Sequence, residues 1–302
     1  MTILYWQVYK NLEKEFLGLA DVIHVDDKQL EVYSMKIADL LIRTVVEIEA
    51  IAKELYLSNG GVIVPDNEMF FDTVCMKHLD SLWNLEKKVV LVVCPSLYFK
   101  EEKNKILKPL HKATRRGTSS ASWNKAYQAV KHNRVRELTK GNIKNLLVAL
   151  AALYVLNLYL KDDKMDKVSQ GDMKNIDSSF GSELFAVKVH DPHGIRTDGV
   201  YIKNTDYDEC VYIYDYESDF KRKATDAMKA LNDYSNKEIQ KILVEKIKER
   251  ASQGLEITEK WLDKERINAT GQIYPVKDYD VQKKMSLLGK LIYRLELNKC
   301  QY

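Results

Sequence analysis

Apolar residues recur at three- and four-residue intervals along much of the first half of the chain. Residues 30–56 carry the clearest stripe, which Asn59-Gly60-Gly61 ends. This spacing places the apolar side chains on one face and predicts a long amphipathic helix. Weaker patterns predict helices over residues 1–20, 67–93 and 123–136.

A fourth segment, residues 142–160, is apolar on almost every side. A helix of that kind has to be surrounded by other helices, so residues 30–160 are predicted to form an antiparallel four-helix bundle. We expect its leucines to be buried: Leu146, Leu150, Leu153 and Leu156. The most apolar run, residues 146–160, is shorter than the roughly 20 residues that span a bilayer, so no membrane partner is expected.

The pattern changes after Lys161. A polar linker is predicted over residues 161–179, followed by a strand over 184–190, a hairpin near 199–216 and helices that include 255–266 and 279–297. The fold class is therefore mainly α. We expect an N-terminal four-helix bundle over residues 1–162 and a C-terminal α+β region over residues 163–302 with a small antiparallel sheet.

The last predicted strand places a row of side chains on one face by its period-two alternation: Cys210, Tyr212, Tyr214 and Tyr216. Such a row could stack nucleic-acid bases. Packing between aromatic side chains of neighbouring strands is the alternative, and we favour it.

Charge is distributed unevenly. Residues 103–144 contain twelve Lys or Arg and one acid, so this segment carries +11 and the rest of the chain carries 3 − 11 = −8. A basic block of this kind is expected to bind a polyanion, with Arg115, Arg116, Lys125 and Lys131 as candidate RNA contacts. Acidic neighbours that neutralise the block are an equally weighted alternative.

Other classes of function have little support. The four cysteines form no CxxC pair, and the sequence contains no P-loop, GxGxxG, HExxH or GxSxG motif. The pair His190 and His193 could contribute to a metal site, but such spacing is common by chance, so no metal and no cofactor are expected. The N-terminus does not resemble a signal peptide, and a cytoplasmic location is expected.

On a helical projection of residues 123–136, Trp123, Tyr127, Val130 and Arg134 share one face. His132 and Arg136 lie on the opposite face, where their i,i+4 spacing could direct both at one anion. Glu47 lies on the apolar stripe of the long helix and needs a buried partner. Arg134 is the best candidate and Lys131 is the alternative, so we expect a structural Glu47–Arg134 ion pair.

The residues Trp123-Asn124-Lys125-Ala126-Tyr127-Gln128-Ala129-Val130-Lys131-His132-Asn133-Arg134, followed by Asn145 and Ala149–Tyr154, resemble the closing half of a HEPN-type helical domain. Residues 46–53 are similar to its opening half, and the likeness covers about residues 30–162. It implies a helical bundle that usually dimerises, and for many members metal-independent RNA cleavage in toxin–antitoxin or phage-defence systems. In the family's nuclease motif the arginine precedes the histidine, whereas here His132 precedes Arg134.

The resemblance and the basic helix together suggest an RNA-acting protein, either a metal-independent ribonuclease or a non-catalytic scaffold. In the first case we expect His132 to transfer a proton, Arg136 to hold the phosphate and Asn133 to orient it. A homodimer would bring two such helices together. In the second case the bundle would mediate dimerisation, and the C-terminal region would bind a protein partner.

Overall fold

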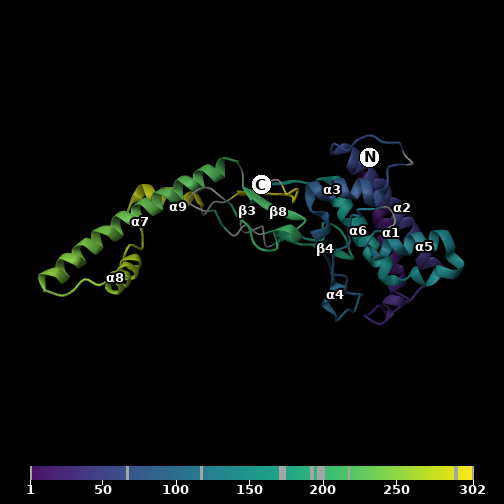
Figure 1. Ribbon diagram of the computed structural model, residues 1–302, viewed down its shortest axis with the longest axis horizontal. Helices are drawn as coiled ribbons and strands as arrows, with labels where there is room; N and C mark the ends of the chain where they lie inside the picture. The colour runs from purple at the N-terminus through teal and green to yellow at the C-terminus, as the bar shows by residue number, and fades with distance from the viewer. Residues whose placement is uncertain are drawn as a thin grey trace.

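The protein is elongated, with helices at one end, small sheets in the middle and a helical arm at the other end (Figure 1). This computed structural model describes residues 2–65, 68–115, 118–169, 175–190, 194–195, 201–216, 218–288 and 292–300. The helical body consists of α1 (Thr2–Ala20), α2 (Met35–Ser58), α3 (Met76–Trp83), α5 (Ser122–Glu137) and α6 (Ile143–Lys161). The expected class, mainly helical with small sheets toward the C-terminus, is confirmed.

The apolar helix α6 lies at the centre of the body and packs against α1, α2 and α5. Its four predicted core residues, Leu146, Leu150, Leu153 and Leu156, are all fully buried. The side chain of Asn142 caps the start of α6 by accepting a hydrogen bond from the backbone N of Asn145 (3.0 Å). By length and composition α6 could span a membrane, but 83% of its most apolar window is buried inside the protein.

The single helix predicted over residues 67–93 is wrong. The chain instead forms a π-helical turn (Phe71–Cys75), α3, and then strand β1 (Val90–Val92). Asn84 ends α3 in a left-handed conformation (φ 51°), and the β-branched residues that follow favour a strand. The helix α1 packs against α2 and α6. The body therefore includes a helix that lies outside residues 30–160, the range predicted for the four-helix bundle.

Two sheets connect the body to the rest of the chain. The first has the order β2-β1-β4, in which β2 is Ile106–Leu107 and β4 is Phe185–Val187. The second has the order β3-β9-β8-β5, with β3 (Met165–Ser169), β5 (Val189–His190), β8 (Tyr212–Tyr216) and β9 (Ile292–Leu297). A short helix, α4 (Glu102–Lys105), precedes β2.

Several predicted elements of the C-terminal half are wrong. The predicted linker contains β3, and the helix predicted over residues 279–297 ends at Leu288 before β9. In β9 every second side chain is buried (Tyr293, Leu295 and Leu297), which is a strand period. The predicted hairpin is also absent, because β7 (Tyr201–Ile202) pairs with β6 (Gly194–Ile195), while β8 pairs with β9 and β5.

The tyrosines of β8 pack inside the protein. Tyr212 stacks on Phe180 with ring centroids 4.1 Å apart. Tyr214 meets Tyr293 edge to face at 6.2 Å. Tyr212 and Tyr214 are both buried, so these two side chains cannot form a stacking platform for bases, and they pack as the alternative interpretation predicts. The side chain of Tyr216 lies outside the described residues.

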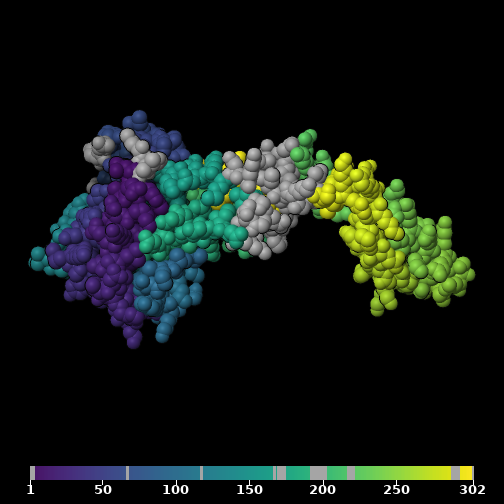
Figure 2. Space-filling view, turned by 180° about the vertical axis from the view of Figure 1, so that it is seen from behind, coloured from purple at the N-terminus to yellow at the C-terminus, as the bar shows by residue number. Residues whose placement is uncertain are grey.

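The arm consists of α7 (Ser218–Ser252), α8 (Glu259–Gln272) and α9 (Tyr279–Leu288), and it projects away from the body (Figure 2). α7 has 35 residues, which corresponds to roughly 52 Å of helix. Both α8 and α9 pack against α7. Few arm residues are buried, namely Ala224, Ala227, Ala269, Ile273 and Val281 among those described, so the arm has no large core of its own.

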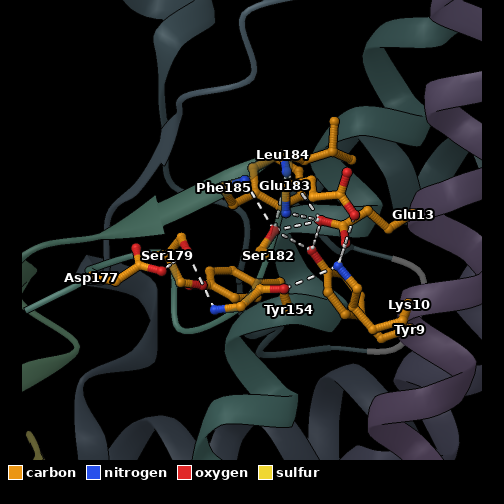
Figure 3. Close-up of polar contacts among 11 residues, drawn as sticks. Tyr9, Lys10, Glu13, Tyr154, Asp177, Ser179, Ser182, Glu183, Leu184 and Phe185 are labelled. Carbon is orange, nitrogen blue, oxygen red and sulfur yellow. Dashed lines mark hydrogen bonds and ion pairs between the residues drawn. The ribbon is translucent and has the colours of Figure 1, made fainter.

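The buried carboxylate of Glu13 joins α1 to the segment that leads into β4 (Figure 3). Its Oε1 accepts hydrogen bonds from Tyr9 Oη (2.9 Å) and Ser182 Oγ (2.5 Å). The same oxygen accepts from the backbone N of Glu183 (2.9 Å) and of Leu184 (3.0 Å). One oxygen of α1 therefore fixes three consecutive residues that are remote from it in sequence.

The second oxygen of Glu13, Oε2, pairs with Lys10 Nζ. Burial disfavours the charged form of Glu13, but hydrogen bonds from Lys10, Ser182, Leu184 and Tyr9 outweigh it and hold the pKa of Glu13 below its usual value of 4.5. The ionised carboxylate is thus the form that the fold prefers.

We predict that Glu13→Gln lowers the free energy of unfolding at pH 7 by about 3 kcal/mol, because breaking one side of a buried pair leaves the other side uncompensated. Since the native pKa of Glu13 is lowered, its contribution is present above pH 4.5 and is lost as the pH falls below that value. Urea denaturation at pH 7 and pH 3 measures both effects.

The control is Glu15→Gln on the same helix, which removes an exposed ion pair with Arg43 and should cost less than about 1 kcal/mol. Equal stability of Glu13→Gln and wild type at pH 7 would contradict the structural role of Glu13. A difference in unfolding free energy between the two proteins that is as large at pH 3 as at pH 7 would also contradict it.

Candidate functional site

The basic helix α5 is anchored by its apolar side. Trp123, Tyr127 and Val130 are buried, as predicted, and Trp123 Nε1 donates a hydrogen bond to the carbonyl oxygen of Pro109 (2.8 Å). Lys125 and His132 are exposed. The sequence pattern therefore correctly separates the core side of α5 from its polar side.

The helix is not straight, because Asn133 has non-helical backbone angles (φ −148°, ψ 63°). The predicted i,i+4 convergence of His132 and Arg136 assumes a regular helix and does not hold across this kink. His132, Asn133 and Arg136 are exposed, and none of the three forms a hydrogen bond or ion pair with another residue of the described chain. One copy of the protein thus has no preformed catalytic arrangement around His132.

The predicted Glu47–Arg134 ion pair is wrong. Arg134 pairs instead with Asp39 (2.8 Å), and the two side chains are 38% and 53% exposed. The kink at Asn133 changes the direction of the residues that follow, so a straight-helix projection misplaces Arg134. Glu47 lies beside Arg43 in a small cavity of about 220 Å³ between α1 and α2. Burial raises the pKa of Glu47, and Arg43 only partly opposes this effect.

Acidic neighbours neutralise half of the basic segment. Six of its twelve basic residues form ion pairs: Lys103–Glu101, Lys105–Glu102, Lys108–Glu209, Lys112–Asp80, Arg134–Asp39 and Lys144–Glu31. Arg116 lies outside the described residues. The remaining five, Arg115, Lys125, Lys131, Arg136 and Lys140, form no ion pair with any residue that the structure describes.

A pocket of about 470 Å³, here called the α5 pocket, has one of these unpaired residues, Lys125, in its lining. It is lined by Glu49, Phe70, Phe71, Asp72, Ser119, Asn124, Lys125 and Gln128. α5 and the residues before it supply four of these side chains, α2 supplies Glu49, and the chain entering the π-helical turn supplies the other three. The volume is within the range of small-molecule sites.

The α5 pocket combines one unused amide with a carboxyl group of altered acidity. Asn124 is only 6% exposed, and its side chain forms no hydrogen bond with the described residues. Burial raises the pKa of Glu49, with Asp72 adding to the effect and Lys131 and Lys53 opposing it. The side-chain oxygen and nitrogen of Asn124 are not among the fully buried atoms that lack a hydrogen-bond partner, so they meet solvent in the pocket and can form hydrogen bonds that the described residues do not use.

The sequence did not indicate this pocket. Phe71 packs against Trp123 with ring centroids 5.7 Å apart, and that contact holds the π-helical turn against α5. A π-helical turn has no simple sequence pattern, and Asn124 lies next to core residues of α5. The only available signal was Lys125, which was predicted to contact RNA and does line the pocket.

The predicted histidine pair cannot be placed as a site. His190 is buried, and its Nε2 accepts a hydrogen bond from the backbone N of Asn204 (3.1 Å). Residues 191–193 lie outside the described residues. Within the described chain, no group of three or more metal-binding side chains occurs.

Comparisons with family models, curated proteins and solved structures find no match for this chain. The resemblance to HEPN domains therefore rests on the sequence pattern of residues 30–162.

We predict that Glu47→Gln leaves the melting temperature unchanged or raises it slightly. Because the native pKa of Glu47 is raised, the ionised form is disfavoured in the fold, so this group reduces stability at neutral pH and not in acid. Thermal unfolding at pH 7 measures the effect. Arg134→Gln should also have a small effect, under about 1 kcal/mol, since its ion pair is exposed. A large loss in either variant would indicate a buried partner for that residue.

Proposed function

We propose that this protein binds single-stranded RNA across α5 and places one unstacked base in the α5 pocket. The observation that supports this proposal most directly is Asn124, a largely buried residue whose side chain lines a pocket together with aromatic and carboxyl groups and the unpaired Lys125. Nucleic-acid backbones bind basic side chains, whereas bases are recognised by hydrogen bonds to their edges and by aromatic contacts. The α5 pocket and its surroundings supply all three kinds of group.

The parts of α5 would have distinct roles. Arg115, Lys125 and Lys131 would contact phosphates, and Arg116 is proposed for the same role from its place in the basic segment of the sequence. Asn124, Gln128 and Glu49 would hydrogen-bond a base edge, and Phe70 and Phe71 would contact its ring. A base held inside a duplex cannot reach such a pocket, so single strands, loops or bulges are the expected ligands.

We further propose that the bound RNA is cleaved without a metal, in a host-defence or toxin system, as the HEPN resemblance implies. The exposed imidazole of His132 would transfer a proton during attack by the ribose 2′-hydroxyl. Arg136 would stabilise the charged phosphate, and Asn133 would orient it. Because one copy provides no preformed arrangement, a homodimer that joins two α5 kinks is part of this proposal.

The second candidate function is a non-catalytic scaffold, which the arm favours. Its three helices have few buried residues and expose Val244, Ile267 and Tyr279. An arm of that composition is suited to protein contacts. A protein partner through the C-terminal region and RNA binding at α5 are compatible with each other.

The RNA-binding proposal predicts that replacing Arg115, Lys125 and Lys131 together with Ala weakens binding of a fluorescent single-stranded RNA. The plot of log Kd against log salt should become shallower by roughly 2, because three phosphate contacts are lost at about 0.7 each. Asn124→Leu should weaken binding with no change in that slope, since an amide contributes no counterion release.

The matched control replaces Lys237, Lys248 and Lys260 of the arm, which are also exposed. This variant removes the same charge and should bind nearly as wild type does. If both triple variants lose affinity equally, general charge and not the α5 face binds the RNA. Duplex RNA that binds as well as single strands would reject the base pocket.

The cleavage proposal predicts that wild-type protein cuts single-stranded RNA in the presence of a chelator, and that His132→Ala reduces the rate at least about 100-fold, as expected for loss of a general acid or base. His111→Ala is the matched control in the same basic segment and should cut normally. Circular dichroism checks the fold of each variant. Absence of cleavage by wild-type protein would leave binding alone and favour the scaffold.

A further inference from the structure

Lys88 is a fully buried lysine between the 3-10 turn Leu85–Lys87 and β1. Its Nζ donates a hydrogen bond to the carbonyl oxygen of Asp208 (3.1 Å), and no carboxylate of the described chain forms an ion pair with it. Burial lowers the pKa of Lys88, while nearby Cys300 and Asp208 partly oppose the shift. A buried ammonium without an ion-pair partner is costly, so the neutral amine is more accessible here than at an exposed lysine.

The Sγ atom of Cys300 lies 3.9 Å from Lys88 Nζ. Asn84 Nδ2 lies 3.6 Å from the same sulfur, which in turn approaches the carbonyl oxygen of Trp83 (3.5 Å). Cys300 is partly exposed, whereas Cys75, Cys94 and Cys210 are buried. Of the four cysteines, only Cys300 is a partly exposed residue whose sulfur also contacts a buried amine.

This contact is held in place by the end of β9. Asn298 is buried, and its Nδ2 donates hydrogen bonds to the carbonyl oxygens of Tyr207 (2.7 Å) and Cys210 (3.0 Å). Its own carbonyl oxygen accepts from Tyr159 Oη (2.8 Å), and its Oδ1 accepts from the backbone N of Cys300 (3.1 Å). These hydrogen bonds fix the backbone that carries Cys300 beside Lys88.

We propose that Cys300 and Lys88 form an oxidation-dependent covalent bridge. Hydrogen peroxide first oxidises the thiol to a sulfenic acid, and one water is released. The neutral Lys88 amine then attacks the sulfur. The N–S bond forms, the S–O bond breaks, and the leaving hydroxide takes a proton from nitrogen as a second water. Thiol, amine and hydrogen peroxide thus give a sulfenamide and two waters.

The bridge would join the end of β9 to the start of β1. β9 lies in the four-stranded sheet and β1 in the three-stranded sheet, so the bridge would link the two sheets covalently. The arm lies between β8 and β9 in sequence and would be enclosed in the linked loop. Its oxidised form should be more resistant to unfolding, as with other cross-links that close long loops.

The test treats reduced, folded wild-type protein with a small excess of hydrogen peroxide and measures its intact mass. The expected product has lost two hydrogens and regains them on treatment with dithiothreitol. Peptide mapping without reductant should identify one cross-linked pair that contains Lys88 and Cys300. The same treatment in urea should lower the yield at least about tenfold, because the folded geometry supplies the effective concentration of the amine.

Cys300→Ser should abolish the bridge, while Cys210→Ser, which removes a buried thiol beside it, should retain the bridge. Because Lys88 is buried and its replacement can unfold the protein, the wild-type peptide map is the deciding measurement. Oxygen gained at Cys300 without a cross-link would overturn the proposal, as would a disulfide or a bridge that retains oxygen. None of these outcomes depends on RNA binding at α5.

Discussion

The buried carboxylate of Glu13 is the contact on which the placement of the sheets depends. An ionised group inside a protein is tolerated only when hydrogen bonds and an opposite charge replace its water. The groups that do so come from α1 itself and from Ser182–Leu184, over 160 residues later in the chain. Once this segment is fixed on α1, β4 follows directly and pairs with β1. The next strand, β5, then pairs with β8, so one carboxylate positions a succession of strands.

The helix α6 provides the apolar burial that stabilises the body, which the carboxylate of Glu13 cannot supply. Nearly all of its residues are buried in the apolar core of the body, but the hydrophobic effect has no direction and would tolerate several arrangements of the surrounding helices. Tyr154 connects the two constraints, because its ring packs against Tyr9 and its hydroxyl donates a hydrogen bond to the carbonyl oxygen of Ser179 (2.7 Å). The apolar cluster continues past the end of α6 into Tyr212, Tyr293 and Leu295. The body and the sheets thus share one core.

The sequence was informative where burial follows a simple period. The stripes of α2 and α6, the core leucines and the buried side of α5 were all predictable from spacing. It was misleading where a tertiary contact overrides the local pattern. β1 and β9 are strands because each has a partner that is remote in sequence. The kink at Asn133 separates His132 from Arg136 and moves Arg134 to Asp39, which a regular helix cannot predict. The α5 pocket depends on a π-helical turn and on Asn124, neither of which has a distinctive pattern.

The basic segment, residues 103–144, contains ion-paired lysines near the sheets and unpaired basic residues along α5. Toward the sheets, Lys108 and Lys112 reach Glu209, Asp80 and Glu86, and Lys112 also uses its backbone N to bind Glu86 Oε1 (3.0 Å). These lysines help to hold the loops between β1 and α5. Along α5, Arg134 pairs with Asp39, whereas Lys125, Lys131 and Arg136 form no ion pair with the described residues, although exposed ion pairs would cost the protein little to provide. Unpaired positive charges repel each other. A bound polyanion relieves this repulsion, and its own counterions are released into solution. The unpaired charge beside the amide of Asn124 is therefore a property that the proposed RNA binding would explain and that folding alone does not require.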